Sequence, residues 1–232
     1  MTKAARNLAL FDLDHTLLPT DSDHEWGRFM VRLGIVDEAS FLREHEKFYS
    51  DYKAGTLDIY AYLRFALEPL TRHTRDELHA WHEQFMKEVI HPAMLPAALE
   101  LVRGHQEAGD LVCMITATNA FVTAPIARAF GIECLIAPMP ATVDGDPLGA
   151  YTGEIDGIPS FQEGKILRTE QWLTSLGLDW SSFERSYFYS DSRNDIPLLE
   201  KVTDPIATNP DPTLRAFATQ HGWRVLELFE AK

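Results

Sequence analysis

The segment that most constrains this chain is residues 8–16, LALFDLDHT. Its four apolar residues are typical of a buried strand, and side chains alternate along a strand, so Asp12 and Asp14 start on the same face. An isolated Asp-x-Asp is usually a strand end with two solvated acids. Here the apolar approach and the trailing Thr16 argue against that interpretation. Because burying two adjacent carboxylates is costly, the segment predicts a cation at the end of a core strand.

The second half of the chain alternates between strand-like and helix-like segments. We expect strands at 111–115, 134–137, 186–189, 205–208 and 224–228, and helices at 97–107, 121–130, 165–176, 195–201 and 212–221. Such alternation predicts an α/β fold with a parallel sheet that is covered on both faces. Residues 138–159 are rich in Gly, Pro and Asp and indicate an antiparallel hairpin, with its turn near 144–146.

A helical region separates the first strand from the rest of this sheet. Four helices are expected, at 23–33, 38–53, 57–67 and from Thr74 to a point before Pro92, the last with a capping box between Thr74 and Glu77. Aromatic residues recur there at helical spacing, which favours a bundle core over a binding surface. We therefore expect a core domain of residues 1–17 and 94–232, and a helical cap domain of residues 18–93.

Polar groups lie at the end or the beginning of three of the later segments. Thr116 ends one expected strand, Gly164-Lys165 begins an expected helix, and Ser190-Asp191-Ser192-Arg193-Asn194-Asp195 follows another strand. Taken singly, Thr or Asn at such a position is usually a helix cap and a lysine is usually solvated. In open parallel sheets, however, ligands bind beyond the carboxyl ends of the strands, so these groups are expected to meet Asp12 and Asp14.

The four segments, in this order, resemble the motifs of the haloacid dehalogenase-like superfamily. Asp12-Leu13-Asp14-His15-Thr16 is similar to its Asp-x-Asp-x-Thr signature, and Asp191 to Asp195 to its Gly-Asp-Ser-x-x-Asp, with Ser190 in place of the usual glycine. A helical insertion after the first motif resembles the phosphoserine-phosphatase branch. The resemblance implies a Rossmann-like parallel-sheet core with an inserted four-helix cap.

The resemblance also implies a chemistry for these residues. Asp12 would attack phosphorus and form an aspartyl phosphate, Asp14 would act as general acid and base, and Lys165 would neutralise the nucleophile and the phosphate. The remaining roles would be phosphate binding by Thr116 and Ala117, substrate contact by Asn194, orientation of Lys165 by Asp195, and Mg²⁺ binding by Asp12, the Asp14 carbonyl and Asp191.

Several alternatives stay open within this resemblance. The acid at Asp14 favours a phosphatase or a phosphomutase, because dehalogenases and ion-pumping ATPases of the superfamily lack it. A non-catalytic binding protein would be expected to have lost Asp12, Asp14, Lys165 or Asp191, and this chain retains them.

The substrate is expected to be a small phosphorylated metabolite. Asp21 lies nine residues after Asp12, where phosphoserine phosphatases carry a glutamate that holds the substrate amine, although Asp21 could equally be a helix cap. Arg64 is the candidate partner for a substrate carboxylate. Histidinol phosphate has an amine and no carboxylate and is slightly favoured, phosphoserine is the next candidate, and sugar phosphates are the alternative.

Composition limits the possible partners and the location. A net charge of −14 over 232 residues disfavours nucleic acid and anionic membrane surfaces. Two cysteines, Cys113 and Cys134, do not form a disulfide framework, and no apolar run is long enough to span a bilayer or to act as a leader. We expect a cytoplasmic monomer or homodimer.

Overall fold

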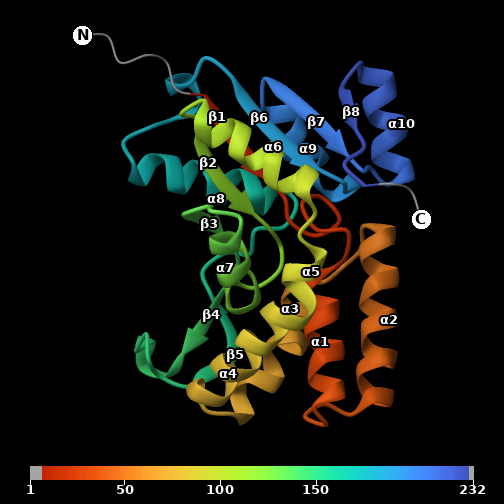
Figure 1. The fold of residues 1–232 in the computed structure, drawn as a ribbon, viewed down its shortest axis with the longest axis vertical. Helices are drawn as coiled ribbons and strands as arrows, with labels where there is room; N and C mark the ends of the chain where they lie inside the picture. The colour runs from red at the N-terminus through yellow and green to blue at the C-terminus, as the bar shows by residue number, and fades with distance from the viewer. Residues whose placement is uncertain (1–6, 230–232) are drawn as a thin grey trace.

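A six-stranded parallel sheet forms one end of the molecule (Figure 1). The structure, a computed structural model, describes residues 7–229. The strand order is β3-β2-β1-β6-β7-β8, and the ranges are β1 (Leu8–Phe11), β2 (Leu111–Ile115), β3 (Cys134–Ile136), β6 (Ser186–Ser190), β7 (Asp204–Thr208) and β8 (Arg224–Leu226). The α/β architecture predicted from the alternating pattern is confirmed.

Helices cover both faces of this sheet. Leu8 and Leu10 face a cluster that includes Leu173 of α8 and Leu214 of α10, whereas Phe11 faces the other cluster with residues of α6 and α7. The helices are α6 (Pro96–Glu107), α7 (Ala120–Ala129), α8 (Glu163–Ser175), α9 (Ile196–Lys201) and α10 (Pro212–His221). Because every residue of β1 is fully buried, β1 is the central strand that both layers pack against.

The chain reverses its winding direction at β1. From β1 the order runs outward through β2 and β3 on one side and through β6, β7 and β8 on the other. Phe11, the last residue of β1, pairs with Met114 of β2 and with Tyr189 of β6. The residues that follow these three strands therefore meet in the crevice where ligands bind in open α/β sheets.

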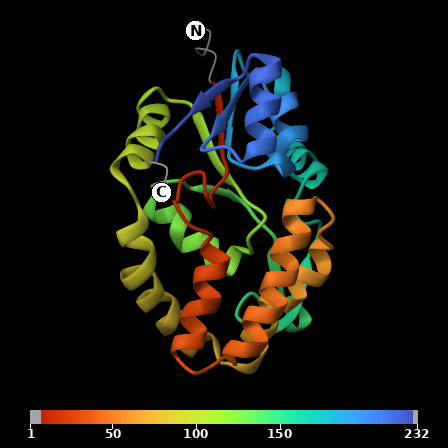
Figure 2. The ribbon, with the colours of Figure 1, turned by 90° about the vertical axis from the view of Figure 1, so that its right-hand side faces the viewer.

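Helices from residues 22–93 form the opposite end of the molecule (Figure 2). They are α1 (Ser22–Arg32), α2 (Glu38–Ala54), α3 (Ile59–Leu67), the 3₁₀ turn Glu68–Arg72, α4 (Arg75–Phe85) and α5 (His91–Ala93). The capping box of α4 is present: Thr74 Oγ1 accepts from the Glu77 amide, and Glu77 Oε2 accepts from the Thr74 amide. The division into a core and a separate cap domain remains a prediction, because Trp26 and Phe85 share one apolar cluster with Phe11 of the sheet.

One predicted helix end is wrong. The helix that begins after Thr74 does not stop before Pro92 but continues through a π-helical turn, Met86–Ile90, into α5. The His91 amide donates to the Met86 carbonyl, five residues back. Proline lacks an amide hydrogen and its ring clashes with the carbonyl four residues earlier in a regular helix; the wider turn just before Pro92 accommodates both effects.

The predicted hairpin is present and lies beside the helices. Strands β4 (Met139–Thr142) and β5 (Tyr151–Asp156) pair antiparallel, with the turn at 143–145, and β5 packs against α3. Arg75 at the start of α4 donates to the Gly149 carbonyl and lies over the Tyr151 ring. The hairpin, which follows β3 of the sheet in the chain, thus packs against the helices at the opposite end of the molecule. No helix within residues 7–229 is long and apolar enough to cross a membrane.

Candidate active site

A cavity of about 440 Å³ lies where the carboxyl ends of β1, β2 and β6 meet the helices. This volume is within the range of roughly 300–1,000 Å³ that is usual for small-molecule sites. The cavity brings together all but one of the site residues predicted from the sequence, namely Asp12, Asp14, Asp21, Thr116, Ala117, Lys165, Asp191, Asn194 and Asp195.

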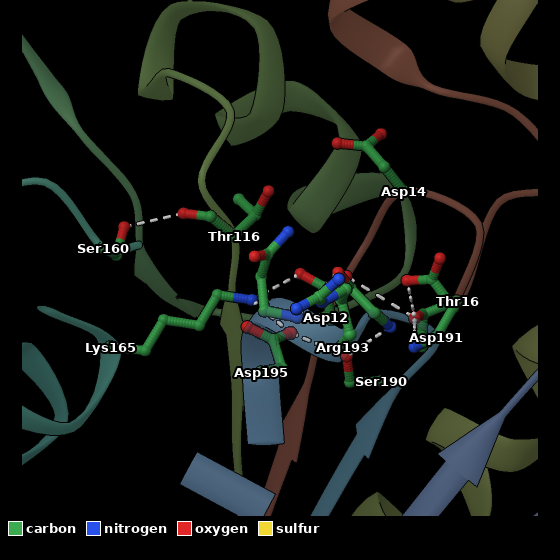
Figure 3. Close-up of polar contacts among 12 residues, drawn as sticks. Asp12, Asp14, Thr16, Thr116, Ser160, Lys165, Ser190, Asp191, Arg193 and Asp195 are labelled. Carbon is green, nitrogen blue, oxygen red and sulfur yellow. Dashed lines mark hydrogen bonds and ion pairs between the residues drawn. The ribbon is translucent and has the colours of Figure 1, made fainter. Parts of the chain in front are cut away.

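Lys165 lies between two carboxylates in the interior of this site (Figure 3). Its Nζ atom donates to Asp12 Oδ1 at 2.9 Å and to Asp195 Oδ2 at 2.7 Å, and its side chain is 3% exposed. Burial alone lowers the pKa of Lys165, but the two carboxylates outweigh it and hold the pKa above the usual range. Lys165 is therefore a fixed positive charge beside Asp12.

A close backbone approach positions Lys165. A Cβ atom at Gly164 would lie 2.2 Å from the Pro159 carbonyl oxygen, so only glycine fits at that point. The preceding Gln162 has a positive φ of 48°, which is unusual for a residue with a side chain. The loop thus turns sharply into α8 and directs the lysine toward the end of β1.

Ser190 stands in place of the family's glycine and contacts the same charge network. Its hydroxyl donates to Asp195 Oδ2 at 2.6 Å, the oxygen that also accepts from Lys165. Ser190 is fully buried at the end of β6. The departure from the family motif therefore adds a hydrogen bond that holds Asp195 in position.

Thr16 connects the nucleophile candidate to Asp191. Its Oγ1 lies 3.5 Å from Asp12 Oδ2 and 3.2 Å from Asp191 Oδ1, and it accepts from the Asp191 amide at 3.0 Å (Figure 3). Since one hydroxyl hydrogen serves two carboxylates, much negative charge stays uncompensated. Burial raises the pKa of Asp191 well above its usual value, and the charges of Asp12 and Asp195 add to the shift.

Asp12 and Asp14 occupy different environments although they are two residues apart. Burial raises the pKa of Asp12 to about 6, and the Lys165 charge opposes this. The Asp14 carboxylate is turned away from Asp12, accepting from the Ser22 amide at 2.7 Å and contacting Thr118 Oγ1 at 2.9 Å. Burial, followed by the Asp21 charge, raises the pKa of Asp14 well above its usual value. Burial thus disfavours the charged form of both carboxyl groups, and of the two only Asp12 has the Lys165 cation beside it.

The oxygen atoms near β1 and β6 fit a divalent cation. Within residues 7–229 no three acidic, His or Cys side chains are grouped closely enough to hold a metal ion alone. The Asp14 side chain is committed elsewhere, so the set would be the Asp12 and Asp191 carboxylates with the Asp14 backbone carbonyl. Mg²⁺ retains several waters and needs few protein oxygens, and it would relieve the repulsion that adds to the effect of burial on the pKa of Asp191.

Thr116 and its neighbours follow β2. Thr116 Oγ1 accepts from the Thr118 amide at 3.1 Å, and its carbonyl accepts from the Ser160 hydroxyl at 2.6 Å. Asn119 caps α7 by accepting from the Val122 amide. Asn119 is therefore the cap of this helix, while Thr118 contacts Asp14.

The position of Asp21 allows both roles considered for it, helix capping and contact with a substrate amine. It caps α1 by accepting from the amides of Asp23 and His24, and its side chain also lines the cavity. A carboxylate at this position can meet a positive group on a ligand.

Arg64 lies outside the cavity, which is a correction to the predicted substrate contact. Its side chain is 51% exposed and faces Glu154 of β5 at 3.8 Å. The helical phase of α3 directs Leu63 and Leu67 into the core and leaves Arg64 on the outer surface. In this conformation Arg64 is not available to a substrate carboxylate at Asp21.

The sequence analysis missed several residues of α2 and α3. His45, Phe48, Tyr49 and Tyr52 of α2 line the cavity together with Tyr62 of α3. The helical spacing of the aromatic residues predicted a bundle core, because spacing alone does not distinguish a core from a cavity wall. Tyr52 contacts the core by donating to Ser192 Oγ at 2.7 Å.

Comparisons with known proteins agree with this geometry. Residues 9–200 match the family model of the haloacid dehalogenase-like hydrolases. The chain is 46% identical over 221 residues to the histidinol-phosphatase of Neisseria meningitidis serogroup C (strain 8013), covering 95% of this chain and 98% of that protein.

Solved structures share this fold. A protein of unknown function from Bordetella pertussis Tohama I is 52% identical, with a TM-score of 0.90 over 97% of this chain and all of that one. A substrate-bound phosphoserine phosphatase, 18% identical, has a TM-score of 0.67 over 97% and 94% of the two chains and so shares the fold. The chain belongs to the haloacid dehalogenase-like hydrolases.

Asp23 provides a test of the buried polar contacts beside the cavity. Tyr62 donates to Asp23 Oδ2 at 2.6 Å and Asn119 donates to Oδ1 at 3.3 Å, and burial raises the pKa of Asp23 to about 7. Because the pKa of Asp is about 3.9 in an unfolded chain, the folded state keeps a proton that the unfolded state has lost between about pH 4 and 7. Its contribution to stability is fully present below that range and is lost as the pH rises through it.

We predict that Asp23→Asn, which has the same shape and no charge, increases the free energy of unfolding relative to wild type, and that the gain grows from about pH 4 to 7 and is constant above. Urea unfolding of both proteins at several pH values measures the difference. A difference that does not depend on pH would contradict the prediction.

Proposed function

We propose that this hydrolase is a phosphatase that cleaves a small phosphate monoester carrying an amine, with histidinol phosphate as its substrate. The observation that carries the reaction is Lys165 held between Asp12 and Asp195 beside Asp191. The similarity to a histidinol-phosphatase over nearly the whole of both chains supports the substrate.

Asp12 is the proposed nucleophile. Its pKa of about 6 leaves it mostly ionised at neutral pH, and the fixed charge of Lys165 lowers the repulsion between it and an incoming phosphate. Attack on phosphorus forms an aspartyl phosphate and breaks the bond to the leaving oxygen. Thr116 and the Ala117 amide, at the end of β2, would hold the phosphoryl oxygens.

Asp14 is the proposed general acid and base. Its raised pKa supports a protonated carboxyl that can give a proton to the leaving alcohol. The resulting carboxylate then takes a proton from the water that hydrolyses the aspartyl phosphate. Hydrogen bonds from Ser22 and Thr118 keep this side chain turned toward the leaving-group side rather than toward Asp12.

The Asp12 carboxylate, the Asp14 carbonyl and the Asp191 carboxylate would hold Mg²⁺. When bound, the ion would neutralise charge on the phosphate during transfer. Asn194 is proposed to bound the substrate side of the site: its Oδ1 accepts from Gln162 and its Nδ2 donates to the Tyr52 carbonyl. Asp195, held by Ser190, orients Lys165.

The amine specificity follows from Asp21 and from the position of Arg64. Asp21 gives the cavity a carboxylate for an ammonium group, whereas the guanidinium of Arg64 is directed to Glu154. A substrate amine therefore has a partner in the cavity, whereas the predicted partner of the phosphoserine carboxylate lies outside it. Free thiols at Cys113 and Cys134 support a cytoplasmic location, and we propose a monomer or homodimer.

We expect Asp12→Asn to fold and to lose turnover, because a neutral amide cannot attack phosphorus. Asp14→Asn should lower kcat by about 10²–10⁴-fold, the usual contribution of general acid–base catalysis. Phosphate release from histidinol phosphate and p-nitrophenyl phosphate measures both. Asp58→Asn is the matched control, because Asp58 is an exposed helix cap outside the cavity and asparagine caps equally well. Wild-type rates from purified Asp12→Asn would rule out the mechanism.

Metal dependence is the second expectation. Activity should disappear with EDTA and return with Mg²⁺, and Ca²⁺ should inhibit, since it takes more ligands at longer distances and would displace the Asp12 carboxylate. The measurement is the initial rate of phosphate release in buffers of defined metal content. Full activity after exhaustive chelation would contradict the proposed Mg²⁺ site.

The substrate preference is tested at Asp21. Asp21→Asn should lower kcat/KM for histidinol phosphate by about tenfold or more, because one charged hydrogen bond is lost, and it retains the helix cap. Glycerol phosphate, which has no amine, should be much less affected. If wild type prefers glycerol phosphate and Asp21→Asn changes neither substrate, the amine specificity is wrong.

A further inference from the structure

One face of α2 forms an aromatic wall of the cavity. His45, Phe48, Tyr49 and Tyr52 recur at the three- and four-residue spacing of one helix face, and all four line the cavity. The rings contact one another and α3: His45 stacks with Tyr49 at 6.1 Å between centroids, and Phe48 meets Tyr62 edge-on at 5.5 Å. The catalytic mechanism proposed above uses none of these rings.

A pair of histidines connects this wall to α1. His24 Nδ1 of α1 and His45 Nε2 of α2 are 2.9 Å apart, a hydrogen-bonding distance. One of the two nitrogens must donate and the other accept, so the tautomer of one ring determines that of the other. Within residues 7–229, no group hydrogen-bonds with the second ring nitrogen of His45, Nδ1, although His45 lines the cavity.

The charged groups are ordered from the reaction centre to this pair. Asp14 is two residues from Asp12 in the sequence and feels the charge of Asp21, and Asp21 in turn acts on His45. A phosphate at Asp12 and an ammonium group at Asp21 would therefore leave the remainder of the substrate against His45 and the aromatic wall. Burial, followed by the neighbouring His24, lowers the pKa of His45 and outweighs the opposing charge of Asp21, which favours the neutral ring.

We propose that His24 and His45 form a specificity-determining pair for a leaving group that ends in a planar nitrogen heterocycle. His45 Nδ1 hydrogen-bonds with a ring nitrogen of the substrate, and the α2 aromatic wall packs on the ring. This inference rests on the proposed function, and imidazole is the heterocycle of histidinol phosphate.

The shared proton adapts the pair to either kind of ring nitrogen. When His24 Nδ1 donates, His45 carries its hydrogen on Nδ1 and donates to the substrate. When His45 Nε2 donates, Nδ1 accepts. A short leaving group such as that of phosphoserine would leave Nδ1 unpaired and the aromatic wall without a partner, which is how sites built for a hydrogen bond reject analogues that lack it.

His24 acts in this proposal as a positioning residue. It is absent from the cavity lining, and its ring packs on Phe41 at 5.9 Å while holding His45. Removing its Nδ1 should therefore alter the binding of a heterocycle through His45. A substitution that restores a hydrogen-bonding atom at that place should restore binding.

The test compares kcat and KM for histidinol phosphate and O-phosphoethanolamine, which has the amine and no ring, in the full-length protein with Mg²⁺. His45→Phe keeps a flat ring and removes both nitrogens. We expect it to lower the ratio of kcat/KM for histidinol phosphate to that for phosphoethanolamine by about tenfold, mainly through KM, as for a lost hydrogen bond. His24→Leu should lower the same ratio, and His24→Asn should restore it.

His79→Phe is the control, because His79 is an exposed histidine of α4 outside the cavity lining, and its ratio should equal that of wild type. An unchanged ratio in His45→Phe, or equal losses for both substrates, overturns the role of the pair and leaves the proposed function intact. Failure of wild type to hydrolyse histidinol phosphate overturns the proposed function and this inference together.

Discussion

The buried ammonium group of Lys165 is the interaction on which the rest of the site depends. Six carboxyl groups line one cavity, those of Asp12, Asp14, Asp21, Asp191, Asp195 and Asp211, and Lys165 is the cation that contacts two of them. Removing one partner of a buried ion pair typically costs about 3–5 kcal/mol, because the other charge is left uncompensated. The close approach at Gly164 and the hydroxyl of Ser190 hold Lys165 and Asp195 in position, so both serve the same electrostatic requirement.

Strand ends supply the charged groups because a parallel sheet brings its carboxyl ends together. This is why the positions of Asp12, Thr116 and Asp191 could be predicted from sequence: Asp12 and Thr116 directly follow short apolar runs, and Asp191 follows another after Ser190. Thr118 and Ser190 escaped prediction because their roles arise from contacts with Asp14 and Asp195, which lie 104 and 5 residues away. Local pattern allowed Thr118 to be a helix cap, and only the fold shows that Asn119 has that role.

The helical residues were predicted less well, for a physical reason. Periodicity identifies the apolar face of a helix but not what that face meets. Phe48 and Tyr52 belong to the same helical pattern as core residues, yet they face a cavity, and Arg64 has a position near α3's core residues but points to Glu154. Pro92 was taken to end a helix, because the π-helical turn that accommodates it depends on packing that a proline in the sequence does not reveal.

Buried polar contacts tie the helices to the sheet at the points where substrate would lie. The Ser22 amide donates to Asp14, Asn119 donates to Asp23, and Tyr52 donates to Ser192. Each contact joins a helix of residues 22–54 to a residue in the loop that follows a strand, so the α2 aromatic wall has a defined position relative to Asp12. Hydrogen bonds between buried groups are costly to break, because the separated partners stay out of water. Substitutions on the exposed part of the wall can therefore change which leaving group fits, while Lys165, Asp12 and Asp191 keep their geometry and the phosphoryl chemistry is retained.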